Sequence, residues 1–181
     1  MINNCNKKMY SFSNCSLDRY GFDQTGKIIY KFDAYGFREG NDYDKKPSIV
    51  FFGCSYLTGI GVKPNERFSS YFNNSWNFGL FGEYKEEESL INYQSFKEKY
   101  KQYKECKVVF CWKANNIDKL KKLITSIDNN KNIYHTAPCM LKLKSYKLMR
   151  ILENLDYDVS GTHYGPKTHK KFSKLLCHFL K

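Results

Sequence analysis

One short stretch, SIVFFGCSYLTGIGV at residues 48–62, brings a serine to the end of an apolar strand. Small residues at a strand end let the backbone turn sharply and leave the side chain at the turn exposed at the sheet edge. Ser55 is therefore a candidate nucleophile. A serine becomes one when a base takes its proton and hydrogen-bond donors await the oxyanion. The alternative is that Ser55 only terminates the strand.

A base and donors are present further along the chain. His163 lies in SGTHYGPKTHKKF, before the last predicted helix, where it would reach the same sheet edge as Ser55. Gly79, in NFGLFG, would offer a backbone N–H, and Asn115 or Asn116, in VVFCWKANN, a side-chain amide. Each has a structural alternative: packing against the last helix for the histidine, a tight turn for the glycine, and a helix cap for Asn115.

Together, the blocks GCSYLTG, NFGLFG, KANN and SGTHYGP resemble the four sequence blocks of the SGNH hydrolases, also called GDSL-type esterases and lipases. The resemblance covers residues 48–181. It implies that Ser55 is the nucleophile and that His163 is the base. It also implies an oxyanion hole made by the N–H groups of Ser55 and Gly79 and the amide of Asn115, with no metal or organic cofactor.

Three positions depart from the family pattern. The last block is usually Asp-x-x-His, and here Ser160 takes the place of the aspartate. That aspartate orients the imidazole, so its loss normally lowers the rate. Asp158 or Asp156 would replace it from a displaced position, or a Ser–His dyad would use a backbone acceptor. The third block, KANN at residues 113–116, leaves open which asparagine faces the site, and Leu57 stands where a hydroxyl residue is common.

The resemblance implies a serine esterase that hydrolyses or transfers an acyl ester, with acetyl groups on carbohydrates as the substrate class. The alternative is a catalytically silent module that binds a glycan or a protein partner in the same cleft, with Ser160 marking the lost triad. Cys54, beside Ser55, is expected to pack beneath the sheet because successive side chains point in opposite directions.

Nucleic acid is not an expected partner, although the net charge of +12 would attract it. Lysine, asparagine, tyrosine, phenylalanine and isoleucine are abundant together, as an AT-rich coding sequence would produce. The lysines are also spread over several predicted helical faces, whereas a basic arm would concentrate them. The sequence leaves the oligomeric state open.

Alternating strands and helices are predicted to position these residues. The strands are expected at 49–52, 75–78, 107–112 and 132–135, and the helices at 66–72, 86–104, 117–127, 143–155 and from Pro166 onward. This alternation predicts an α/β, flavodoxin-like three-layer sandwich with a central parallel sheet of about five strands. In such sheets ligands bind beyond the carboxyl ends of the strands, where Ser55 lies.

Composition is typical of a globular chain with one main domain. The 181 residues are 41% hydrophobic and 27% charged. Residues 47–181 are expected to form the SGNH-like domain, and residues 1–46 a small β extension with a hairpin or edge strands around KIIYKF. Seven scattered cysteines without a C-x-x-C pair indicate a reducing compartment, without a disulfide framework or zinc site. With no signal peptide or membrane-length apolar run visible, a cytoplasmic location is expected.

Overall fold

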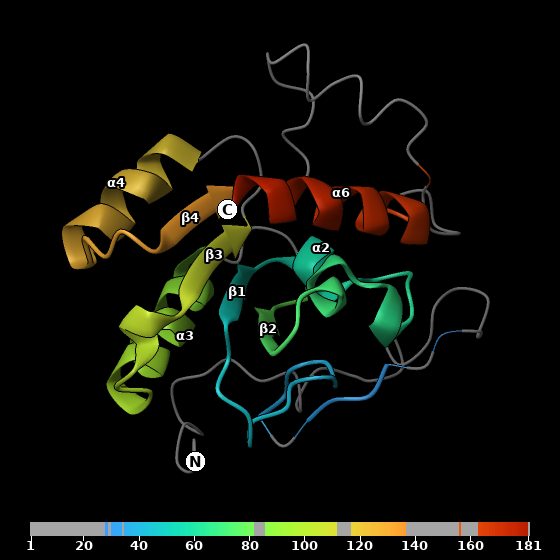
Figure 1. The fold of residues 1–181 in the computed structure, drawn as a ribbon, viewed down its shortest axis with the longest axis horizontal. Coiled ribbons are helices and arrows are strands. Elements are labelled where there is room, and N and C mark those ends of the chain that lie inside the picture. The colour runs from blue at the N-terminus through green and yellow to red at the C-terminus, as the bar shows by residue number, and fades with distance from the viewer. Residues whose placement is uncertain are drawn as a thin grey trace.

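The structure is a computed structural model that describes residues 28, 30–33, 35–81, 86–111, 117–136, 156 and 163–180. Figure 1 shows the arrangement of its strands and helices. The helix predicted at 143–155 lies outside the described residues, as does part of the strand predicted around KIIYKF. Of the expected N-terminal hairpin or edge strands, the described residues contain one isolated antiparallel bridge, between Phe32 and Arg38.

Four strands form one parallel sheet, and they are β1 (Ile49–Gly53), β2 (Ser75–Gly79), β3 (Lys107–Cys111) and β4 (Ile133–Thr136). Their order is β2-β1-β3-β4. The chain first moves outward from β1 to β2 and then crosses back to β3, so the direction of winding reverses between β1 and β3. The predicted parallel α/β sheet is confirmed, with four strands among the described residues where about five were expected.

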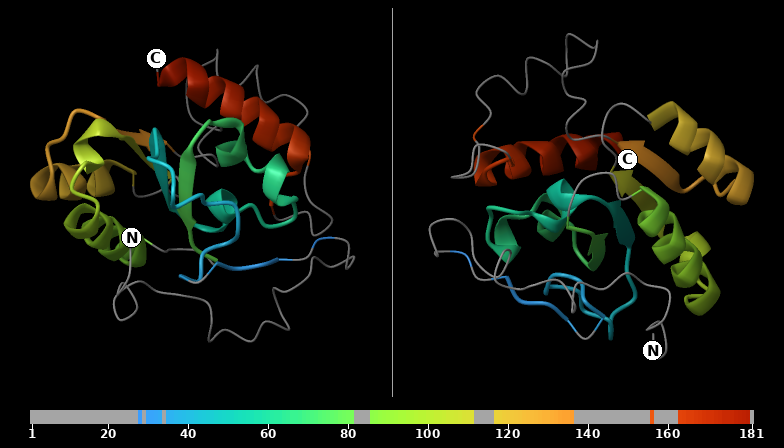
Figure 2. Two further views of the ribbon diagram at one scale, coloured as in Figure 1. Left: turned by 60° about the horizontal axis from the view of Figure 1, so that its bottom comes forward. Right: turned by 180° about the vertical axis from the view of Figure 1, so that it is seen from behind.

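Helices cover both faces of this sheet, as the views in Figures 1 and 2 show. One face carries α3 (Glu86–Lys99) and α4 (Ile117–Ile127), and their side chains join the core on that side. The other face carries α6 (Pro166–Phe179), which shares a second core with the sheet. The sheet therefore forms the middle of three layers.

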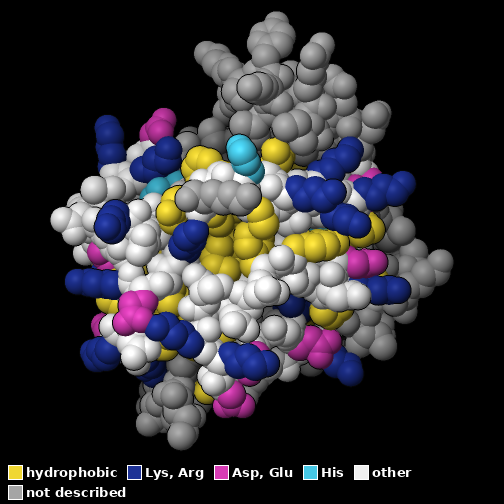
Figure 3. Space-filling model, viewed as in Figure 1, with side chains coloured by type: hydrophobic (Ala, Val, Ile, Leu, Met, Phe, Trp, Pro, Cys, Tyr) yellow, Lys and Arg dark blue, Asp and Glu magenta, His cyan; other side chains and the backbone are white. Residues whose placement is uncertain are grey.

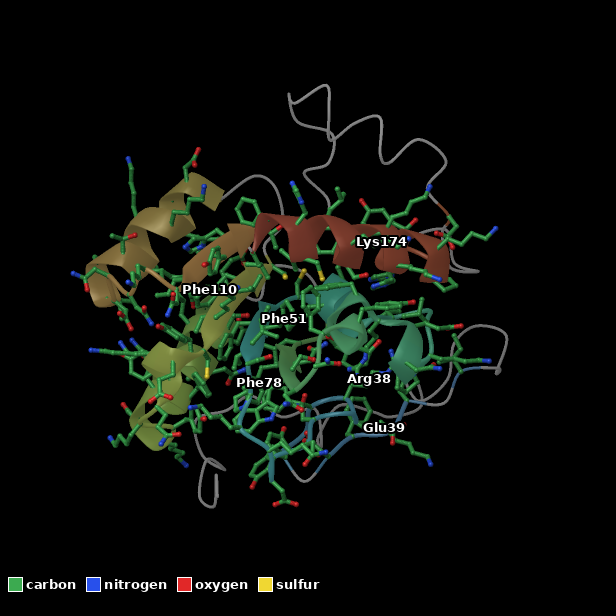
Figure 4. All side chains as sticks on the ribbon, viewed as in Figure 1. Arg38, Glu39, Phe51, Phe78, Phe110 and Lys174 are labelled. Carbon is green, nitrogen blue, oxygen red and sulfur yellow. The ribbon has the colours of Figure 1, made fainter. Side chains whose placement is uncertain are left out.

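Side chains of β1 alternate between the two cores. Val50 and Phe52 lie in the core beneath α3 and α4, together with Phe110 of β3. Ile49 and Phe51 lie in the core beneath α6; Phe51 and Phe110 are labelled in Figure 4. Because both faces of the strand are buried, its sequence is a continuous apolar run without polar alternation.

Residues 66–72 do not form the predicted helix. The segment instead makes two 3-10 turns, η2 (Pro64–Glu66) and η3 (Phe68–Tyr71). Between them Arg67 is extended, with ψ of 145°. Its Nη2 donates to the carbonyl of Glu39 at 2.6 Å, so the break in the helix accompanies a long-range contact that no local propensity predicts.

The other predicted helices that fall within the described residues are present, with one change of length. α4 has the predicted bounds, and α6 begins at Pro166 as expected. α3 ends at Lys99, short of the predicted residue 104, and a separate 3-10 turn, η4 (Tyr103–Glu105), leads into β3.

The end of the N-terminal extension packs against the edge of the sheet. Phe37 is fully buried in the core beneath α3, and Trp76 Nε1 donates to the carbonyl of Asp42 at 2.8 Å. Asn41 covers the outer edge of β2: its Nδ2 donates to the carbonyl of Asn77 at 3.1 Å, and the Asn77 amide donates to its Oδ1 at 2.7 Å. One side chain thus takes the place of a neighbouring strand and protects the sheet edge.

Basic side chains lie all over the face in Figure 3, with acidic ones between them. Of the four cysteines that the structure describes, Cys54, Cys106 and Cys111 are buried and Cys177 is exposed. No helix in the described ranges combines the length and apolar character needed to cross a membrane.

Candidate active site

The candidate nucleophile lies on the first turn of a short helix at the end of β1. β1 ends at Gly53, Cys54 is extended, and α2 (Ser55–Thr58) begins with Ser55, whose side chain is 3% exposed. Gly59 ends α2 with φ of 77°, a conformation that glycine adopts without strain. Ser55 therefore lies at the carboxyl end of β1, beside the point where the winding of the sheet reverses and where ligands bind in such folds.

His163 reaches Ser55 from 108 positions further along the chain. It lies just before α6, and its Nε2 is 3.1 Å from Oγ of Ser55. With Nε2 unprotonated, the serine hydroxyl donates to it. This is the arrangement in which an imidazole accepts the proton of a nucleophile. The structure thus brings together the candidate nucleophile and the candidate base.

Two tyrosines flank this pair. Tyr56 follows Ser55 in sequence, and Tyr164 follows His163. The Tyr56 ring centroid is 5.3 Å from that of the His163 imidazole and 5.1 Å from that of Tyr164. Both tyrosines are half-buried. Their packing limits the orientations open to the imidazole and leaves aromatic surface beside it.

Gly79 ends β2 opposite Gly53 and lies against the backbone of α2. A Cβ at this position would be 2.5 Å from the amide nitrogen of Thr58 and 2.9 Å from the carbonyl carbon of Leu57. The close approach of α2 to β2 therefore requires glycine. The Gly79 N–H donates to Oδ1 of Asn77 at 2.9 Å. In this structure, the predicted oxyanion donor is engaged within the protein.

Asn77 ties β2 to α2, a role that the sequence analysis did not predict. It is 4% exposed, and its Nδ2 donates to the carbonyl of Leu57 at 2.9 Å and to Oγ of Ser69 at 2.7 Å. Both ends of its amide therefore bind the protein and hold α2 over the strand. A polar residue inside a mostly apolar strand was the feature of the sequence that could have indicated a buried hydrogen-bonding role for Asn77.

Asp156, one of the two acids expected near His163, caps α6. Its Oδ2 accepts from the Lys167 amide at 2.9 Å, and its Oδ1 accepts from the amide and the hydroxyl of Thr168, each at 2.5 Å. Its carbonyl accepts from the Gly165 amide at 2.9 Å, which closes the loop that carries His163. Burial alone would raise the pKa of Asp156, but the hydrogen bonds from Thr168 and Lys167 lower it below the usual value.

Three other residues that the sequence singles out lie outside the described residues: Asp158, Ser160 and Asn115. The acid that would orient His163 and the third oxyanion donor therefore stay predictions, as does the choice between Asn115 and Asn116.

His169 is a second buried histidine, on α6. It is 4% exposed, its Nδ1 accepts from the Phe68 amide at 3.1 Å, and its ring stacks on the Phe68 ring with centroids 5.9 Å apart. Desolvation by burial lowers the pKa of His169 to about 3, so the ring is neutral at physiological pH. These contacts fasten α6, and with it the adjoining His163 loop, to η3.

No protein-family model, curated protein or solved structure matches this chain. Within the part of the chain that the structure describes, no three His, Cys, Asp or Glu side chains gather into a group that would hold a metal ion.

Proposed function

We propose that this protein is a serine esterase of the SGNH type, which hydrolyses or transfers the acyl group of an ester. The observation that supports this most strongly is the distance of 3.1 Å between Oγ of Ser55 and Nε2 of His163. Both the position of Ser55 at the carboxyl end of β1 and the order of the strands agree with a ligand site there.

In the proposed reaction, Oγ of Ser55 attacks the ester carbonyl carbon while Nε2 of His163 takes the hydroxyl proton. The bond from the carbonyl carbon to the alcohol oxygen then breaks, and His163 gives the proton to the leaving alcohol. Water attacks the acyl-enzyme with His163 again as the base, which releases the acid and restores Ser55. A transferase would accept an alcohol in place of this water.

Negative charge on the carbonyl oxygen requires hydrogen-bond donors, each worth on the order of 3 kcal/mol in the transition state. The Ser55 amide suits this role because the first amides of a helix have no intrahelical acceptor. The Gly79 N–H would contribute after exchanging Oδ1 of Asn77 for the oxyanion. The Asn115 amide is the expected third donor.

The aromatic pair Tyr56 and Tyr164 supports a carbohydrate ester as the substrate class. Tyrosine presents an apolar ring face with a polar hydroxyl at its tip, which suits a sugar ring with one apolar face and many hydroxyl groups. An acetylated glycan would place its ring on these tyrosines and its ester carbonyl at Ser55.

A catalytically silent binding module is the second candidate, and Ser160 is the observation that favours it. In the family, the aspartate at this position stabilises the charged form of the imidazole, and serine carries no charge for that role. The same cleft would then bind a glycan or a protein without turnover.

Labelling by a fluorophosphonate, followed by intact-mass spectrometry, separates the two candidates. The esterase forms one covalent adduct and hydrolyses p-nitrophenyl acetate, and both reactions disappear in Ser55→Ala. Ser70→Ala is the matched control, because Ser70 is an exposed serine whose hydroxyl binds backbone carbonyls away from His163. A wild-type protein that neither reacts nor hydrolyses the ester would support the silent module.

A further inference from the structure

Arg38, which Figure 4 labels, is buried and binds the turn that follows α2. Its side chain is 1% exposed. Nη1 donates to the carbonyls of Thr58, at 3.2 Å, and Gly59, and Nη2 donates to the carbonyl of Val62 at 2.5 Å. Thr58 is the last residue of α2 and Gly59 is its C-cap. One guanidinium thus binds two carbonyls at the end of the helix that begins with Ser55 and a third in the turn that follows it.

Tyr30 holds the same turn from the same side. Its hydroxyl accepts from the Gly61 amide at 2.7 Å. The Arg38 guanidinium lies over the Tyr30 ring, with Cζ 4.5 Å from the ring centroid, a favourable cation–π geometry. Tyr30 is itself 5% exposed. Two residues of the N-terminal extension therefore fix the turn between α2 and η2.

This arrangement has an energetic cost. Burial of a guanidinium removes it from water, and desolvation lowers the pKa of Arg38 to about 10. The Nε of Arg38 has no hydrogen-bond partner among the described residues. A four-residue helix such as α2 cannot keep its orientation by itself, since so short a helix is not stable alone. Asn77 and Gly79 hold α2 on the side of β2, and the carbonyl contacts of Arg38 fix its C-terminal end.

We infer that Arg38 is a positioning residue for Ser55, which it holds within reach of His163 by fixing the C-terminal end of α2. The inference rests on the proposed esterase function, because it assigns a role in placing the nucleophile. It also gives the N-terminal extension, residues 1–46, a part in the reaction through Arg38.

Arg67 provides a matched control. It is 3% exposed, and desolvation lowers its pKa to about 9. It too binds backbone carbonyls, those of Pro64 and Glu39, and neither carbonyl belongs to α2 or its C-cap. Arg38→Met and Arg67→Met therefore remove equivalent buried guanidinium groups while keeping an apolar stem. Methionine keeps the Cγ with which Arg67 packs against Gly59, so only Arg38→Met removes hydrogen bonds from the end of α2.

The experiment measures kcat, KM and the rate of fluorophosphonate labelling at a temperature where circular dichroism shows every variant folded. We expect Arg38→Met to lower kcat and the labelling rate by the same factor, roughly ten- to a hundredfold, with KM little changed. Arg67→Met should keep the kcat of the wild type. Arg38→Lys, which keeps one charged donor group, should fall between Arg38→Met and the wild type.

A second measurement covers the case in which Arg38→Met does not fold. It compares the labelling rates of Arg38→Lys and Arg67→Lys: the first should label more slowly than the wild type, because one ammonium cannot reach all three carbonyls, and the second should keep the wild-type rate. Equal kcat for the Arg38 and Arg67 variants, in a chain that is active as wild type, would overturn the positioning role and leave the esterase proposal standing. A wild-type chain that does not react would overturn both.

Discussion

Oγ of Ser55 lies 3.1 Å from Nε2 of His163, although 108 positions of the chain separate the two residues. Each residue reaches this contact from a segment that other residues fix. Ser55 begins a helix that packs on Gly79, and His163 belongs to a loop whose base Asp156 closes. The supporting residues can therefore be tested apart from the reacting pair.

Gly79→Ala should lower kcat because the added methyl would push against the backbone of α2 at Thr58 and Leu57. We expect a loss of stability of about 1–3 kcal/mol, typical of overpacking, and a loss of kcat that remains after correction for the folded fraction. Gly40→Ala is the control: its Cβ would meet the guanidinium of Arg67 and no atom of α2, and its φ of 119° makes alanine costly there for a second reason. If both variants lose stability and both keep kcat, the contact of Gly79 with α2 does not position Ser55.

Asp156→Asn should destabilise the protein by about 1–2 kcal/mol at neutral pH, because an amide NH2 would face the Lys167 N–H and the charge at the helix N-terminus would be lost. The folded-state pKa of Asp156 is lowered. Its contribution is therefore complete above the unfolded-state pKa of about 3.9 and is lost as the pH falls through the folded-state value. Urea unfolding of both proteins should show the difference in stability shrinking below about pH 4.

The exposed Asp118, in the first turn of α4, supplies the control Asp118→Asn. This variant should change the free energy of unfolding by less than about 0.5 kcal/mol. An Asp156→Asn protein that is as stable as Asp118→Asn would contradict the capping role.

His169 should make the protein less stable in acid. Its folded-state pKa of about 3 lies below the ordinary histidine value near 6.5, so its contribution is present above about pH 6.5 and is lost as the pH falls toward the folded value. In His169→Asn, the amide oxygen can still accept from the Phe68 N–H, and the titration is gone. Between pH 7 and pH 5 the wild type should lose about 2 kcal/mol more than this variant. Equal losses in urea titrations would show that His169 is not buried as described.

Tyr56→Ala and Tyr164→Ala should raise KM for an acetylated oligosaccharide more than for p-nitrophenyl acetate, because only the former presents a sugar ring to the aromatic pair. Tyr71→Ala is the matched control, since Tyr71 is 40% exposed and lies on η3. Equal changes of KM for both substrates would contradict a carbohydrate site at these tyrosines.

Much of the fold was predictable because its signals are local. The strand IVFF is a continuous apolar run, and α4 carries its apolar residues at helical spacing, so both were predicted close to their observed bounds. The contact of Ser55 with His163 could be expected because the blocks GCSYLTG and SGTHYGP resemble those that carry the nucleophile and the base in the SGNH hydrolases.

The supporting contacts could not be predicted because their partners are backbone carbonyls far away in sequence. From sequence, Arg38 would be expected on the surface, as most arginines are. Its acceptors are backbone carbonyls, which every residue has, so no residue type marks them in the sequence. Arg67 also binds a distant carbonyl, that of Glu39, and its extended backbone interrupts the helix predicted at 66–72. Asp156 lies close enough to His163 in sequence to suggest an orienting acid, whereas the structure uses its carboxylate at the start of α6.

The most direct measurement is the rate of fluorophosphonate adduct formation at Ser55 across pH, in the wild type and in His163→Gln. We predict a rate that rises with pH through the range where histidine loses its proton and that falls about 100-fold or more in His163→Gln. A rate that is the same in both proteins at every pH, or a wild-type Ser55 that forms no adduct, would contradict the Ser55–His163 account.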